Sequence, residues 1–157
     1  MIEPEGSKYA HFLYDICKYL CYGIESAGYS CCILRNRLAS DRVNVLMGAH
    51  NLTDPTIAET IKKTGPYILL QSEIITGDTI NHWPHQKAFQ DIYLPLMREA
   101  SAVWTGVQAN VEALKNLEIE ADLLLTGYHP LMEEIHHKTD KDIDFLGRKL
   151  ENPDFVG

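Results

Sequence analysis

The chain has 157 residues and a formal net charge of −8, with 45% hydrophobic and 23% charged residues. This length and composition fit one globular domain with a single core and exclude an intrinsically disordered chain. The acidic charge disfavours a nucleic-acid surface and docking on anionic membranes, because both interactions need basic side chains.

The sequence has no apolar run near the roughly 18 residues that span a bilayer, and its N-terminus lacks a cationic stretch followed by an apolar one. We therefore expect a cytoplasmic protein of bacterial type with no membrane span. Its four cysteines are then expected to be reduced thiols that mostly pack in the core. They lie at Cys17, Cys21, Cys31 and Cys32.

A zinc site built from these cysteines is geometrically awkward. Cys17 and Cys21 would share a helix face, whereas Cys31 and Cys32 would point to opposite faces of a strand. We predict no metal site, and keep a metal- or thiol-dependent enzyme only as a minor alternative.

The first predicted element is a helix with Ser7 as its N-cap and Gly28 as its stop, because apolar residues between them recur at helical spacing. A second helix is predicted from Pro55 to Gly65, capped by Asp54. A third should begin at Trp83-Pro84 and be ended or kinked by Pro95. Further apolar runs predict strands at residues 30–34, 43–47, 67–73, 101–106 and 121–126, and the last predicted helix covers residues 107–119.

Strands that alternate with helices indicate an α/β protein, and continuous apolar runs indicate strands buried on both faces. We therefore predict a three-layer, Rossmann-like parallel sheet with helices on both faces. The domain should cover residues 1–147, followed by a polar tail at 148–157. The carboxyl ends of parallel strands meet at one edge, where ligands bind in such sheets.

Polar side chains follow two of these strands directly. His50 and Asn51 come after the strand at 43–47, and Glu73 comes at the end of the next strand. An imidazole and a carboxylate at this edge predict a ligand site with acid–base chemistry. In the alternative interpretation, His50 and Asn51 satisfy local backbone groups and Glu73 pairs with an arginine.

Several segments, taken in order, resemble one family. They are "VNVLMGAHNL", "GPYILLQSEII", "AVWTGVQANVEALKNLEI", "LLLTGYHPLMEEI" and "KDIDFLG", which together span roughly residues 43–147. Their order and spacing are similar to those of the N-terminal half of bacterial glycosyltransferase-like proteins with the GT-B fold.

The resemblance implies the acceptor-binding half of an enzyme that transfers a sugar from a nucleotide-sugar donor. It makes Glu73 and His50 the candidate catalytic residues, and it places Asn51, Asn110, Tyr128 and His129 around a small-molecule or glycan acceptor. No cofactor is implied besides the donor itself, which is a co-substrate. The donor would be held by a second domain or a partner chain.

A non-catalytic function competes with the enzyme. A half of a GT-B protein leaves apolar surface where the other half packs, and such a surface favours a homo-oligomer or another partner. The sequence therefore leaves open a binding or scaffold protein that keeps the fold without the transfer reaction.

Overall fold

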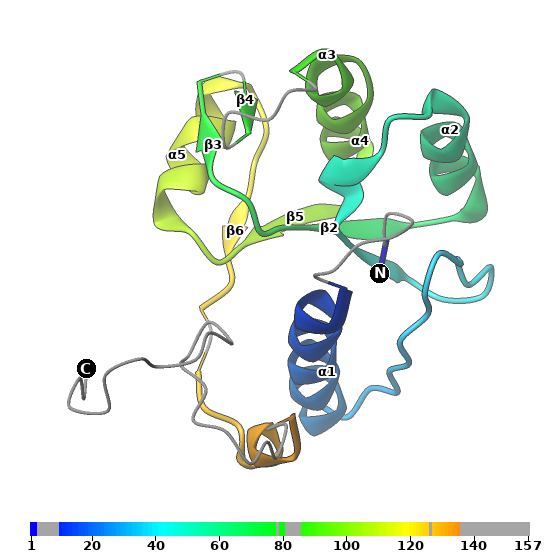
Figure 1. The fold of residues 1–157 in the computed structure, drawn as a ribbon, viewed down its shortest axis with the longest axis vertical. Helices are drawn as coiled ribbons and strands as arrows, with labels where there is room; N and C mark the ends of the chain where they lie inside the picture. The colour runs from blue at the N-terminus through cyan, green and yellow to red at the C-terminus, as the bar shows by residue number, and fades with distance from the viewer. Residues whose placement is uncertain (3–9, 78, 81–85, 126, 136–157) are drawn as a thin grey trace, which may run out of the picture.

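A computed structural model gives the structure of the chain and describes residues 1–2, 10–77, 79–80, 86–125 and 127–135 (Figure 1). A parallel four-stranded sheet has the strand order β1-β2-β5-β6. An antiparallel ribbon of β3 and β4 lies apart from this sheet. The strands are β1 (Asn44–Met47), β2 (Tyr67–Gln71), β3 (Ile75–Thr76), β4 (Thr79–Ile80), β5 (Ala102–Thr105) and β6 (Asp122–Leu123). The predicted α/β class with a parallel sheet is confirmed.

Figure 1 shows α2, α4 and α5 on one side of the sheet and α1 on the other. The crossovers between parallel strands move in one direction along the sheet, so right-handed connections place their helices on one face. The helices are α1 (Ala10–Ser26), α2 (Pro55–Thr64), α3 (Gln86–Ala88), α4 (Leu94–Glu99) and α5 (Gln108–Asn116). Single helical turns form η1 (Ala49–Asn51), η2 (Phe89–Tyr93) and η3 (Pro130–Ile135), of which η2 is π-helical.

The start of α2 follows the prediction. Asp54 Oδ1 accepts a hydrogen bond from the Thr56 amide at 2.8 Å, and Pro55 occupies the first helical position, where its missing N–H costs nothing. Pro95, which was predicted to end or kink the helix, does not end it, because the helix continues to Glu99. The π-helical turn of η2 lies directly before α4 and accommodates the missing hydrogen bond of the proline.

Two predictions about α1 and the residues that follow it were wrong. Residues 30–34 form no strand, and Cys21 and Cys31 form a disulfide with a Cα–Cα distance of 5.4 Å instead of two reduced thiols. Gly28, with φ of 89°, turns the chain back along the helix end and brings the two sulfurs together. Cys17 and Cys32 are free.

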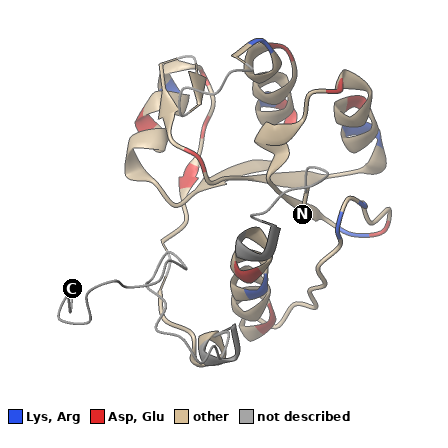
Figure 2. Cartoon of the chain, in the orientation of Figure 1, with Lys and Arg blue, Asp and Glu red and all other residues tan. Residues whose placement is uncertain are grey.

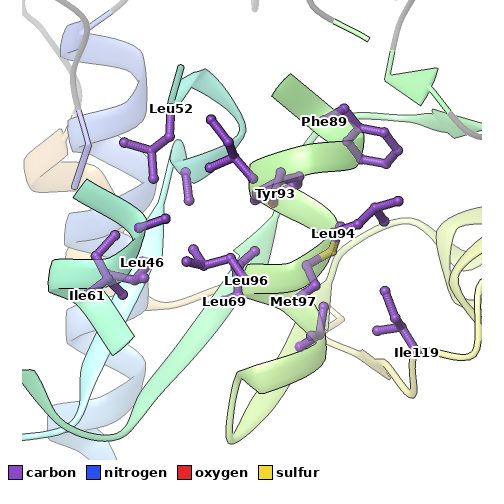
Figure 3. Close-up of a cluster of buried hydrophobic side chains, with 14 of the residues drawn as sticks. Leu46, Leu52, Ile61, Leu69, Phe89, Tyr93, Leu94, Leu96, Met97 and Ile119 are labelled. Atoms are coloured by element: carbon purple, nitrogen blue, oxygen red, sulfur yellow. The ribbon is translucent and has the colours of Figure 1, made fainter. Parts of the chain in front are cut away.

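The hydrophobic core lies between the sheet and the helices α2 and α4. Figure 3 shows Leu46 and Leu69 of the sheet facing Ile61 of α2 and Leu96 and Met97 of α4. Leu69 and Leu96 are fully buried, as expected for a sheet face covered by helices.

Charged residues of the described helices are interspersed. Figure 2 shows acidic and basic segments along both α1 and α2. On α2, Lys62 pairs with Glu59 at 3.3 Å and with Glu99 of α4 at 2.7 Å, and the hydrogen bond to Glu99 is the main cause that raises the pKa of Lys62. Exposed pairs of this kind contribute little stability.

No helix in the part of the chain that the structure describes is long and apolar enough to cross a membrane. Some predicted features lie outside the described residues. These are the Ser7 cap, the helix start at Trp83-Pro84, the "DIDFLG" segment and the tail at 148–157.

Candidate active site

The chain turns sharply where β1 ends, and this turn carries His50 to the carboxyl edge of the sheet. Gly48 adopts φ of 80°, a left-handed conformation, and a Cβ atom there would lie 2.5 Å from the carbonyl oxygen of Ile2. Only glycine fits both restraints. The turn η1 follows at once, so that His50 leaves the strand and remains largely buried.

The Asn51 amide indicates which ring nitrogen of neutral His50 carries the hydrogen. The Asn51 Nδ2 group donates to the carbonyl of Gly48 at 3.1 Å, and the same nitrogen lies 3.1 Å from His50 Nε2. An amide N–H cannot accept, so His50 Nε2 accepts and the ring hydrogen is assigned to Nδ1. The two residues that sequence reasoning proposed together are therefore in direct contact.

His50 and Glu73 come from the ends of neighbouring strands and meet. His50 Nε2 lies 3.8 Å from Glu73 Oε1, with 8% of the His50 side chain and 35% of the Glu73 side chain exposed. Burial lowers the pKa of His50, and the nearby Glu73 carboxylate opposes that shift. The arrangement is a buried neutral imidazole beside a carboxylate that reaches solvent.

A buried polar network holds the loop that carries Glu73. Asn110 Nδ2, from α5, donates to the carbonyl of Glu73 at 2.8 Å and to Thr105 Oγ1 at 3.0 Å, while Asn110 Oδ1 accepts from the amide of Ile75 at 2.9 Å. Gln71 Nε2 donates to the same Glu73 carbonyl at 2.7 Å. Gln71, Thr105 and Asn110 are fully buried, so these hydrogen bonds replace water for the loop backbone.

Asn110 thus lies next to the candidate pair, with its amide engaged by the chain itself. Its predicted part in ligand binding stays a prediction. The structure adds a scaffold role, because Asn110 ties α5 and β5 to the loop after β2.

Tyr93 belongs to this site although the sequence did not single it out. Its ring meets the His50 ring edge-on, with centroids 6.3 Å apart and an interplanar angle of 79°. Its hydroxyl donates to Gln71 Oε1 at 2.5 Å, and burial is the main cause that raises its pKa well above the ordinary value. A buried tyrosine needs a polar partner. An isolated tyrosine in a helical pattern gives no indication of which partner that is.

His129 lies elsewhere, against α1, and Tyr128 directly precedes it in the chain. Tyr128 is 74% exposed. His129 stacks on Tyr22 with ring centroids 5.6 Å apart, and its Nε2 is 2.9 Å from Ser26 Oγ. The structure therefore brings His50, Asn51, Glu73 and Asn110 together. It places His129 on the C-terminal half of α1 and leaves Tyr128 largely exposed. Their roles in ligand binding stay predictions.

No group of three or more metal-ligating side chains occurs among the described residues. A surface hollow of about 410 Å³ lies along α2, lined by Pro55, Thr56, Glu59, Thr60 and Lys63, and contains none of the proposed site residues.

Comparisons with protein-family models, with curated proteins and with solved structures found no match.

Proposed function

We propose that the chain is the acceptor-side domain of a glycosyltransferase of the GT-B type, with a Rossmann-like, three-layer fold. The parallel order β1-β2-β5-β6 supports this fold, as do crossover helices on one side and α1 on the other. The segments between residues 43 and 147 that resemble the family support the same assignment.

The observation that carries the proposal is the pairing of His50 with Glu73 at the carboxyl ends of β1 and β2. Ligands of open parallel sheets bind beyond these ends. Of the two side chains, Glu73 is much more exposed to solvent than His50. Glu73 is therefore the group that meets the acceptor.

In the proposed reaction, a hydroxyl of the acceptor attacks the anomeric carbon of the donor sugar. The new C–O bond forms while the bond to the nucleoside diphosphate breaks, and the diphosphate leaves with the electron pair. Glu73 takes the hydroxyl proton as general base. The Glu73 carboxyl then holds this proton beside the buried His50 imidazole, whose Nε2 lies 3.8 Å from Glu73 Oε1.

The donor is held by a second domain or a partner chain in this proposal. Helix N-termini and basic side chains of that other half would hold the diphosphate, so no metal ion is required of this half. Asn51, beside His50, is the proposed contact to the acceptor, and the fully buried Asn110 supports the loop. The acceptor contacts predicted for Asn110, Tyr128 and His129 stay predictions.

The test is a transfer assay with the full assembly and a panel of nucleotide sugars, in which release of nucleoside diphosphate is measured. Glu73→Gln should reduce the rate by about 100-fold or more, as expected for loss of a general base. Glu112→Gln on the exposed face of α5 is the matched control and should keep the wild-type rate. Equal turnover for Glu73→Gln and the wild-type chain would remove Glu73 from the mechanism.

A second candidate is a non-catalytic binding or scaffold domain. Large apolar side chains are exposed close together in the segment after β6, at Leu125, Tyr128, Leu131 and Met132. Exposed apolar groups of this kind favour association with a partner or a second copy. Light scattering and the transfer assay together distinguish the candidates, because a chain that self-associates and shows no transfer in the full assembly supports the scaffold.

The cytoplasmic location stays a prediction, and the disulfide opposes it. Structural disulfides are rare in reducing compartments. Alkylation of free thiols in intact cells, followed by mass spectrometry, decides between a reducing and an oxidising compartment. A Cys21–Cys31 bond found in cells indicates an oxidising compartment, whereas alkylated Cys21 and Cys31 support the cytoplasm.

A further inference from the structure

Tyr93 contacts His50 directly and is linked to Glu73 through Gln71. Its ring packs edge-on against the imidazole of His50. Its hydroxyl donates to Gln71 Oε1, and Gln71 Nε2 donates to the main-chain carbonyl of Glu73. Tyr93 is almost completely buried, so these contacts form without competing water.

The Gln71 amide is held at both ends. The Glu73 carbonyl can only accept, so the Gln71 nitrogen faces it, and the Gln71 oxygen then faces the Tyr93 hydroxyl, which donates to it. Without the tyrosine hydroxyl, the amide oxygen loses this buried partner, and the hydrogen bond from Gln71 to the Glu73 carbonyl is less firmly held. Asn110 then becomes the main restraint on that carbonyl.

We propose that Tyr93, acting through Gln71, is a positioning residue that sets the Glu73 carboxylate beside the His50 imidazole. A role in catalysis rests on the proposed function. The positioning itself is a property of the folded chain and is measurable without substrate. The π-helical turn that contains Tyr93 aims one side chain at the end of β2 and at η1, two segments that bring the catalytic pair together.

The experiment measures how strongly Glu73 acts on His50, by following the His50 ring resonances in an NMR titration. The Glu73 carboxylate raises the pKa of His50. Glu73→Gln removes this negative charge, so the His50 pKa should fall in this variant. The same substitution is then made in a Tyr93→Phe background. If Tyr93 positions Glu73, the fall in that background should be about half of the wild-type value or less.

The matched control is Tyr67→Phe. The Tyr67 hydroxyl donates to the carbonyl of Leu96 at 2.8 Å, and Tyr67 is also buried, at the opposite end of β2 from Glu73. Removal of this hydroxyl deletes a comparable buried hydrogen bond. In the Tyr67→Phe background, Glu73→Gln should therefore lower the His50 pKa as much as in the wild-type chain.

The outcomes separate cleanly. An equal fall in the Tyr93→Phe and wild-type backgrounds overturns the proposal, as does an unchanged His50 pKa in Glu73→Gln alone. If Tyr93→Phe does not fold, Gln71→Met replaces it, because this substitution fills the same space and removes both amide hydrogen bonds. A reduced fall combined with no sugar transfer in the full assembly would keep the positioning role and reject only the glycosyltransferase.

Discussion

Two regions of the molecule are held together in opposite ways. At the carboxyl edge of β2 and β5, the buried side chains of Gln71 and Asn110 hydrogen-bond the loop after β2, and Thr105 accepts a further hydrogen bond from Asn110. At the C-terminal half of α1, an exposed contact joins Ser26 to His129, and a disulfide joins Cys21 to Cys31. Buried polar groups are costly to leave unpaired, whereas exposed groups return to water. The first region is built to keep its geometry, and the second is built from weak contacts reinforced by a covalent bond.

The largest effect is expected from Asn110→Leu, which breaks the buried region. The amide of Ile75 loses its acceptor, and the Glu73 carbonyl and Thr105 Oγ1 each lose a donor. The free energy of unfolding should fall by about 3–4 kcal/mol, since a buried unpaired group costs about 1–3 kcal/mol. Urea denaturation measures this loss. A fall as small as that of the exposed variant Ser26→Ala, less than about 0.5 kcal/mol, would show that the network is not a scaffold.

Removal of the disulfide tests the second region. The bond joins residues that are ten positions apart, and loop closure of this length is worth about 2–3 kcal/mol. The double variant Cys21→Ser with Cys31→Ser should lose about that much in thermal or urea denaturation under oxidising conditions. Addition of a reductant should bring the wild-type chain to the same stability and leave the variant unchanged. A wild-type chain that is insensitive to reductant would contradict this expectation.

Local rules in the sequence predicted much of the sheet. The apolar runs at β1, β2 and β5, the Asp54-Pro55 helix start and the Gly28 stop all depend on neighbouring residues and were confirmed. The proximity of His50 and Glu73 was also predictable, because parallel strands end at one edge.

The remaining features depend on partners far apart in the chain. The disulfide pairs a helix residue with a segment whose pattern resembles a strand, so spacing alone favoured the wrong structure. The scaffold bonds of Asn110 reach residues 35 and 37 positions away, and those of Tyr93 reach Gln71 across 22 positions. Hydrophobic periodicity gives no information on such polar pairs, because it reports only which face is buried.

A smaller effect is expected from pH, again at the buried edge. Because burial lowers the folded-state pKa of His50, the unfolded chain binds its proton more readily. The His50 contribution is therefore fully present above the ordinary histidine pKa of 6.5 and is lost as the pH falls toward the lower folded-state pKa. The slope from this one group is at most about 1.4 kcal/mol per pH unit.

Stability curves between neutral and mildly acidic pH measure this slope. His50→Gln should flatten it, whereas Glu73→Gln should extend it to lower pH, because the pKa of His50 falls further without the carboxylate. Identical curves for the wild-type chain and His50→Gln would show that the imidazole is not held in its neutral form.

The smallest effect on stability is expected at the exposed contact between α1 and the segment after β6. The Tyr19 hydroxyl donates to the carbonyl of Gly127 at 2.5 Å and accepts from the amide of Gly127 at 2.8 Å. Because this site is exposed, Tyr19→Phe should lower the free energy of unfolding by less than about 1 kcal/mol. The Gly127 amide should nevertheless lose its protection from hydrogen exchange, while the Ile75 amide beside Asn110 keeps it. If both amides stayed equally protected in the variant, the two regions would not differ in the way that their burial indicates.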